Sequence, residues 1–329
     1  MLLNSLFIIV GIALIIWGAD RMTEGASSLA RGMRVSEIVI GLTIVAAGTS
    51  APELFVSLVS AFRGSADMAV GNVVGSNIFN TMLIVGCSAV VAPMAVSRDT
   101  VTKDIPFAFV ASLLLFVLCF DDMDSVHLWG NEINRSDGIV LLVGFSAFMA
   151  YTFHIARKEG KLLPSDAGEI VQRPKDFSNL RRDLFFIVLG LACLIGGSEL
   201  FVNAASYVAH RFGIRQSVIG LTIVAGGTSL PELATSVVAA YKGRSAIAIG
   251  NVLGSCVFNI LLILGLTVVI HPLRIINITI VDLTMLFLSV GFLWLCAFTK
   301  YSISRREGLV LIAGFAAYMA WLFFLWSSL

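Results

Sequence analysis

Long apolar runs, separated by short charged or turn-rich breaks, dominate this chain. A helix needs about 20 apolar residues to cross roughly 30 Å of hydrocarbon at 1.5 Å per residue. The runs therefore predict an all-α membrane protein of ten transmembrane helices, with the first and sixth extending further into Gly- and Ala-rich sequence. We expect these helices near residues 4–19, 36–61, 68–92, 104–120, 137–153, 183–203, 215–240, 247–270, 278–298 and 307–326.

The two halves of the chain repeat one another. A shift of 179 residues aligns 39–59 with 218–238 at 16 of 21 positions, and 71–80 with 250–259 at 7 of 10. A shift of 170 aligns 138–151 with 308–321. Each half then holds five predicted helices, and homologous halves with an odd number of helices must enter the membrane from opposite sides.

The basic residues support this inverted arrangement. The odd-numbered connections hold 17 of the 22 Lys and Arg residues, and such connections face the cytoplasm by the positive-inside rule. We expect both termini outside, a multi-pass protein of the cell inner membrane, and central helices that are broken. The predicted organisation is a first five-helix repeat at 1–153, a cytoplasmic linker at 154–182 and a second, inverted repeat at 183–329.

Composition excludes several classes of protein. The chain is 58% hydrophobic and only 13% charged, with a mean hydropathy of +0.94, which does not suit a soluble surface. A net charge of +1 offers no field for nucleic acid, so we expect the lipid bilayer as the main partner. The five cysteines each lie alone in an apolar run, and we infer neither disulfides nor zinc.

Two matching motifs place acids and prolines inside predicted spans. They are GTSAPE at 48–53 and GTSLPE at 227–232. A central acidic side chain costs roughly 2.5 to 3.5 kcal/mol on insertion scales, so Glu53 and Glu232 are candidates for a functional site. Prolines at 52 and 231 remove helical N–H donors, and broken helices at this depth are typical of ion sites in inverted-repeat transporters.

A second pair of motifs supplies neutral oxygens. Each half carries an Asn, a Ser and an Asn spaced by four, which places them on one helix face. We expect the last two of each trio to bind the ion and leave the first open, since Ser and Asn also join membrane helices by hydrogen bonds. The trios are Asn72, Ser76 and Asn80, and Asn251, Ser255 and Asn259.

The predicted donors are all hard oxygens, which suits calcium or sodium rather than zinc or copper. Two carboxylates can be neutralised by one divalent ion or by two or more monovalent ions. Competition between these cargoes predicts an exchanger, in which Ca²⁺ and Na⁺ are transported and no resident cofactor is needed.

These paired motifs resemble the alpha repeats of the cation/calcium exchanger superfamily, in its bacterial sodium/calcium exchanger form, over nearly the whole chain. The resemblance implies exchange of calcium for sodium by alternating access, with the first and sixth helices sliding across the core. An Asn at 259, where potassium-dependent members carry Asp, argues against potassium. The implied ligands are the carbonyls of Ala46 and Ala225 and the side chains of Thr49, Ser50, Glu53, Ser76, Asn80, Thr228, Ser229, Glu232, Ser255 and Asn259.

Other functions stay open at this stage. The nearest alternative is a calcium/proton exchanger, in which a buried Glu carries the proton. A cation channel or sensor is a second, and an intramembrane hydrolase using Ser50 or Ser229 is disfavoured because no predicted span offers a His or Lys partner. We therefore expect no enzyme, and leave open stoichiometry, selectivity among Ca²⁺, Mn²⁺, K⁺ and H⁺, direction of transport, conformational state and oligomeric state.

Overall fold

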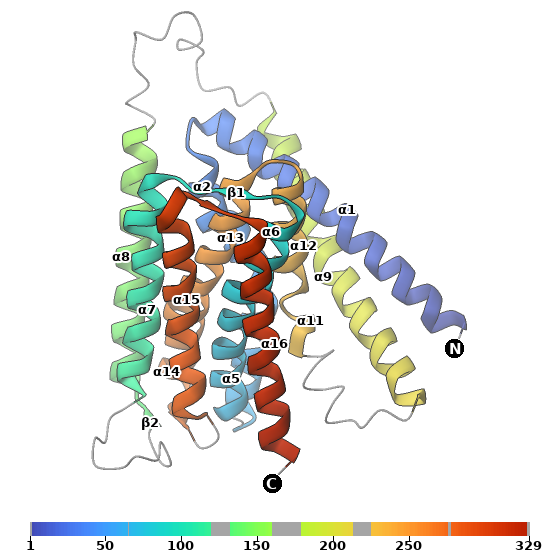
Figure 1. Cartoon of the computed structure of the whole chain (residues 1–329), viewed down its shortest axis with the longest axis vertical. Helices are drawn as coiled ribbons and strands as arrows, with labels where there is room; N and C mark the ends of the chain where they lie inside the picture. Colours follow the sequence, from blue (N-terminus) through green and yellow to red (C-terminus); the bar gives the residue numbers. More distant parts are fainter. Residues whose placement is uncertain are drawn as a thin grey trace, which may run out of the picture.

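The chain forms a bundle of long helices in the computed structural model (Figure 1). The structure describes residues 2–64, 66–119, 132–159, 179–212, 225–275 and 278–327. The first half contains α1 (Leu2–Met33), α2 (Glu37–Ile40), η1 (Gly41–Val45), α3 (Ala46–Thr49), α4 (Ala51–Phe62), α5 (Ala66–Ile78), η2 (Phe79–Ile84), α6 (Val85–Val91), η3 (Thr100–Asp104), α7 (Ile105–Leu118) and α8 (Arg135–Glu159). The second half contains α9 (Leu180–Arg211), α11 (Ala225–Gly227), α12 (Leu230–Tyr241), α13 (Ser245–Val257), η5 (Phe258–Leu264), α14 (Gly265–Ile270), α15 (Ile280–Lys300) and α16 (Arg305–Ser327).

Several of these pieces join end to end into single long helices. Within the described residues, eight helices are long and apolar enough to cross a membrane, or nine when the bent pair from Glu37 to Phe62 is one span. The remaining predicted span, 215–240, falls partly on residues outside the described ranges. The prediction of a largely helical membrane protein is confirmed, and the number ten stays a prediction.

The helices at the centre of the chain are longer than the apolar runs alone suggested. Helix α8 continues to Glu159 and α9 begins at Leu180, so both ends of the predicted linker at 154–182 are helical. Residues 160–178 lie outside the described part of the chain.

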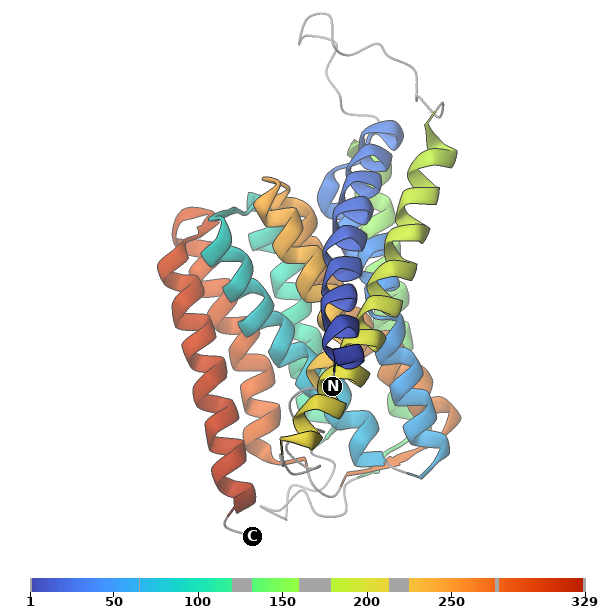
Figure 2. The ribbon, with the colours of Figure 1, turned by 90° about the vertical axis from the view of Figure 1, so that its right-hand side faces the viewer.

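Helices α1 and α9 lie together along one side of the bundle and slant across it (Figures 1 and 2). They run antiparallel and meet through glycines: a Cβ built on Gly18 would lie 2.7 Å from the carbonyl oxygen of Gly190, and one on Gly11 would lie 2.9 Å from that of Gly197. The 179-residue shift converts Gly11 into Gly190 and Gly18 into Gly197. The two contacts are therefore equivalents of each other with the halves exchanged.

Two short antiparallel strand pairs repeat this relation. Strand β1 (Met94–Ala95) pairs with β4 (Ser302–Ile303), and β2 (Glu132–Ile133) pairs with β3 (Leu273–Arg274). The β1 pair lies at the end of the bundle drawn at the top of Figure 1, which we call the upper end, and the β2 pair lies at the lower end. Since β3 is the repeat equivalent of β1, equivalent segments lie at opposite ends.

The burial pattern suits a lipid environment. Large apolar side chains point outward along the peripheral helices, including Ile9, Phe185, Leu295 and Phe324, while polar side chains concentrate inside the bundle. This reverses the usual distribution of a soluble protein and agrees with the apolar runs in the sequence.

Candidate cation site

The site is built at two helix breaks. Helix α3 ends at Thr49, and α4 starts beyond Ser50, whose φ of −82° and ψ of 7° are not helical. The axes on either side differ by 46°. The second half repeats this break at Ser229, with φ −91° and ψ 8°, between α11 and α12.

A proline follows each break and explains it. Pro52 and Pro231 occupy the first turns of α4 and α12, where a missing N–H costs nothing. The same missing N–H would interrupt a continuous helix at this point. The sequence thus ends one helix and begins another in mid-bundle, as the predicted broken helices require.

The two acids lie in the first turns of these new helices. Glu53 and Glu232 both have 0% exposed surface. Their positions at helix N-termini place the carboxylates where the helix dipole favours negative charge. Each acid is nevertheless buried inside a bundle, so it depends on specific partners for solvation.

Those partners come from the opposite repeat. Ser50 Oγ donates to Glu232 Oε1 at 3.0 Å, and Ser229 Oγ donates to Glu53 Oε1 at 2.9 Å. The neighbouring threonines are crossed in the same way, with Thr49 beside the carboxylate of Glu232 and Thr228 beside that of Glu53. The two breaks therefore form one site rather than two.

The predicted Ser side chains of α5 and α13 and the predicted Asn side chains of the following segments, η2 and η5, close around this pair. Ser76 Oγ lies 3.3 Å from Ser229 Oγ. Asn80 is buried beside the thiol of Cys256, and Asn259 Nδ2 lies 3.4 Å from Asn77 Oδ1. Ser255 is fully buried as well. These side chains come from segments of the two repeats that contact each other, since α5 contacts η5 and α13 contacts η2.

Several buried oxygens of this cluster have no protein hydrogen-bond partner among the described residues. A buried polar atom left without a partner costs about 1 to 3 kcal/mol. A cation that accepts electron pairs from these oxygens would remove that cost. The atoms are Glu53 Oε2, Glu232 Oε2, Asn80 Oδ1, Ser255 Oγ and Asn259 Oδ1.

The Ala46 carbonyl, one of the two predicted backbone ligands, already accepts protein hydrogen bonds, unlike the side-chain oxygens above. The carbonyl of Ala46 accepts the N–H of Ser50 at 3.0 Å and the hydroxyl of Thr49 at 3.4 Å. Ala225 begins α11 at the equivalent place. For both carbonyls, ion binding stays a prediction.

The first Asn of each trio, whose role the sequence did not decide, forms hydrogen bonds with the backbone next to the helix break. Asn72 Nδ2 donates to the carbonyl of Glu53 at 3.3 Å and to Ser57 Oγ at 3.1 Å. Asn251 Nδ2 makes the equivalent bonds, to the carbonyl of Glu232 at 3.4 Å and to Ser236 Oγ at 3.0 Å. Ser57 and Ser236 were not predicted, although each lies four residues after its Glu and faces the same way.

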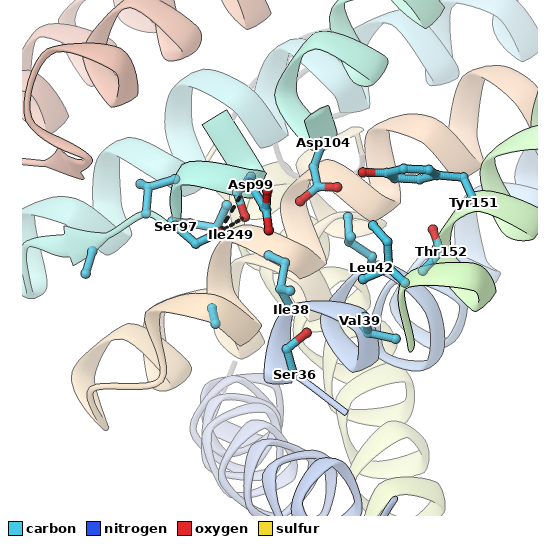
Figure 3. Close-up of a pocket in the computed structure, with 15 residues that line it drawn as sticks. Ser36, Ile38, Val39, Leu42, Ser97, Asp99, Asp104, Tyr151, Thr152 and Ile249 are labelled. Carbon is cyan, nitrogen blue, oxygen red and sulfur yellow. Dashed lines mark hydrogen bonds between the residues drawn. The ribbon is translucent and has the colours of Figure 1, made fainter. Parts of the chain in front are cut away.

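A separate cavity of about 250 Å³ opens elsewhere, toward the upper end. Asp104 of η3, Asp99 just before it and Tyr151 of α8 face the cavity, and apolar side chains such as Leu42 and Ile249 line the rest (Figure 3). Neither Glu53 nor Glu232 lines this cavity. The predicted site is therefore a tightly packed cluster of polar side chains that lies apart from this cavity.

Comparison with known proteins decides the family. The family model described as sodium/calcium exchanger protein matches residues 3–154 and 183–324. The chain belongs to this family. The resemblance stated from the motifs is confirmed, while the division into repeats at 1–153 and 183–329 stays a prediction.

Relatives of this exchanger family match along most of their length. Sodium/calcium exchanger MaX1 of Methanosarcina acetivorans is 32% identical over 98% of this chain and 99% of its own. Inner membrane protein YrbG of Escherichia coli is 34% identical over 99% and 98%. Putative antiporter CaxA of Alkalimonas amylolytica is 40% identical over 83% and 82%.

The fold is also shared with a solved exchanger. A structure of the sodium-calcium exchanger NCX_Mj, soaked with 10 mM Na⁺ and no Ca²⁺, superposes with a TM-score of 0.81 at 29% identity. The match covers 97% of this chain and 98% of that one. This family member is thus a membrane antiporter of the sodium/calcium-exchanger type in sequence and in fold.

Proposed function

We propose that this protein exchanges calcium for sodium across the cell inner membrane, by alternating access at the site between Glu53 and Glu232. One observation carries the proposal: two fully buried carboxylates, each bonded to the Ser of the opposite repeat, surrounded by oxygens without protein partners. Such a cluster of hard oxygens suits calcium and sodium.

Charge explains why the two cations would compete. The ionised pair carries two negative charges, which one Ca²⁺ neutralises, or two or more Na⁺ ions do. Both cargoes together would leave excess positive charge in a site with 0% exposure at either acid. A site that holds one or the other, and faces one side at a time, exchanges them.

The direction in which the serine hydroxyls donate their protons favours a cation as the transported ion. Ser50 and Ser229 direct their protons to carboxylate oxygens, which leaves their lone pairs available. These serines bond to acids and not to a His or Lys, so the proposal includes no enzymatic step and no resident cofactor. MaX1 and NCX_Mj, both named sodium/calcium exchangers, support calcium and sodium as the cargo.

The proposal includes inverted five-helix repeats. Equivalent strand pairs at opposite ends and antiparallel α1 and α9 support this arrangement. With the basic connections inside, both termini would lie outside, and the relative named an inner membrane protein agrees with that membrane.

Ion flux into vesicles tests the proposal. Purified protein in proteoliposomes loaded with sodium should take up radioactive calcium when sodium outside is low, and Glu232→Gln should abolish this uptake. Uptake that needs a pH gradient and ignores sodium would replace the proposal with a calcium/proton exchanger. Calcium uptake without any counter-ion would indicate a channel.

A further inference from the structure

Asn251 connects the two repeats at the site. This side chain on α13 has 0% exposed surface, and its Oδ1 accepts the hydroxyl of Thr49 at 3.0 Å. Its Nδ2 donates to the carbonyl of Glu232 and to Ser236 Oγ. One amide thus holds the backbone beside one acid and a predicted ligand from the other repeat.

The orientation of this amide follows from its partners. The carbonyl of Glu232 only accepts hydrogen bonds, so Nδ2 has to face it. Oδ1 then faces Thr49, and the Thr49 hydroxyl has to be the donor. Its other neighbours, the Ala46 carbonyl and the Glu232 carboxylate, are acceptors too, so three acceptors compete for one proton. The bond to Asn251, at 3.0 Å, is shorter than the bond to the Ala46 carbonyl, at 3.4 Å, and it therefore takes the proton and leaves the lone pairs of Thr49 free.

We propose that Asn251 is a positioning residue for the cation: it holds the Thr49 hydroxyl with its proton turned away and its lone pairs toward the acids. This inference rests on the proposed function and deepens it. Asn72 makes the equivalent donor bonds, but it is partly exposed, and Thr228, the repeat equivalent of Thr49, is half-buried. We expect Asn251 to matter more than Asn72 for cation affinity.

Equilibrium binding of radioactive calcium to purified protein tests this role without requiring transport. Asn251→Ala should weaken calcium binding by on the order of tenfold, the effect of one misplaced hydrogen-bonding group. In a Thr49→Val background the same substitution should add less than about twofold, because the group on which it acts is gone. Ser236→Ala, which removes a bond on the other side of the amide, should leave affinity near the wild type.

The outcomes separate positioning from mere packing. An equal tenfold loss in both backgrounds, or no loss in either, would overturn the proposal. If Asn251→Ala does not purify as a single species, Asn251→Gln in the wild-type and Thr49→Val backgrounds provides a second double-mutant cycle. If wild-type protein binds calcium but sodium gradients drive no flux, the proposed function fails while this test still stands.

A second and independent observation concerns ion pairs at the upper end. The turn between α12 and α13 lies there, and its Lys242 forms an ion pair with Asp20 of α1. Arg244 of the same turn pairs with Glu37 at 3.0 Å, and Ser27 of α1 donates to that Glu37. These contacts fasten α1 to the central helices.

The repeat predicts a second set of partners at the lower end. The 179-residue shift converts Asp20 into Glu199 and Lys242 into Arg63, so the opposite charges are conserved between halves. Glu199 and Arg63 are both exposed, and no ion pair joins them in the part of the chain that the structure describes.

The packing of α1 and α9 shows the same asymmetry. A Cβ on Gly48 would lie 2.6 Å from Leu191 of α9, which covers the break in the first half. The repeat equivalent of Leu191 is Ile12 of α1, which is 42% exposed, and the equivalent glycine, Gly227, meets Val202 of α9 instead. Equivalent residues therefore have different surroundings, as expected when α1 and α9 are displaced toward one end.

We infer that the ion pairs Asp20–Lys242 and Glu199–Arg63 are alternate latches. The first forms when α1 and α9 close the upper end of the site, and the second forms when they close the lower end. This rests on the proposed alternating access. The Arg244–Glu37 pair has no charged equivalent, since the shift leads to Ser65 and Gln216. The upper end therefore has the stronger latch and is the end closed at rest.

Calcium affinity measured separately at the two faces of oriented proteoliposomes tests the latches. Asp20→Asn should raise apparent affinity at the upper face and lower it at the lower face, by about two- to fivefold for a partly exposed ion pair. Glu199→Gln should shift both affinities in the opposite directions. The exchanged pair Asp20→Lys with Lys242→Asp should restore part of each shift, since Arg21, which also pairs with Asp20, keeps its charge.

Shifts of the same sign from both single variants, or none, would overturn the latch. Cross-linking gives a readout independent of transport, with the partly exposed Cys87 and Cys193 replaced by Ser. Asp20→Cys with Lys242→Cys should cross-link most of the molecules, and Glu199→Cys with Arg63→Cys only a minor fraction. Equal and complete cross-linking of both pairs would contradict mutually exclusive latches even if the transported ions differ from those proposed.

Discussion

At the scale of single residues, a carboxylate with no exposed surface needs protein or ion partners to replace its lost hydration. Glu53 and Glu232 each receive one serine hydroxyl on Oε1, while Oε2 has no protein partner within the described residues. Half of each carboxylate is thus committed to the protein, and the other half is available to a cation.

The first prediction concerns the acids. Glu53→Gln and Glu232→Gln should each lower calcium transport by on the order of 100-fold or more, because one charge cannot balance a divalent ion in a buried site. Proteoliposome flux measures this, and elution of the variants as single species shows that they fold. Glu132→Gln, an exposed acid at the lower end, is the control and should transport normally.

The second prediction concerns the crossed hydroxyls. Ser50→Ala and Ser229→Ala should each raise the KM for calcium by about 10- to 100-fold, the value of a hydrogen bond to a charged group. The bonds are equivalent, at 3.0 and 2.9 Å, so the two effects should be similar. An unchanged KM in both variants would mean that these serines do not shape the site.

At the scale of elements, the sequence could predict where the helices break but not which side chains meet across the break. Repetition of the GTS-x-PE motif and the chemistry of proline were sufficient to locate the breaks at Ser50 and Ser229. The crossed pairing of each Ser with the other repeat's Glu depends on how two distant helices pack, which no local pattern encodes.

The same limit explains the residues that were misjudged or missed. Asn72 shares a helix face with Ser76, so spacing alone could not show that its amide reaches the carbonyl of Glu53. Helix α1 extends past residue 19, as the Gly- and Ala-rich sequence predicted, but its end at Met33 could not be located, because small residues and a buried face replace the strong apolar signal there. Tertiary contacts therefore decided both outcomes.

A third prediction tests the packing of α1 on α9. Gly18→Ala should destabilise the protein by about 1 to 3 kcal/mol, because the new Cβ would lie 2.7 Å from a backbone oxygen that a rigid helix cannot move aside. Thermal unfolding in detergent measures the change. Gly196→Ala is the matched control on α9, where a Cβ meets nothing within 4 Å, and it should be neutral or slightly stabilising.

At the scale of the whole molecule, most of the central contacts occur twice with the halves exchanged, whereas the ion pairs at the upper end have no formed equivalent within the described residues. The crossed hydroxyl bonds, the glycine contacts and the strand pairs all map onto their equivalents by the repeat shifts. A molecule built this way can present the same site to either side by exchanging the environments of its halves.

The fourth prediction tests the inverted arrangement. Ala95 in β1 and Arg274 in β3 are equivalent, and both are exposed. In intact cells, a membrane-impermeant thiol reagent should label Arg274→Cys, while Ala95→Cys should react only after the membrane is opened. Labelling of both from the same side would contradict inverted repeats.

Calcium binding to purified protein, with sodium as competitor, tests the central claim most directly. Wild-type protein should bind radioactive calcium saturably, rising sodium should displace it, and binding should be lost in Glu53→Gln and in Glu232→Gln alike. Calcium binding that persists at wild-type affinity in either variant would show that the two acids do not form one cation site.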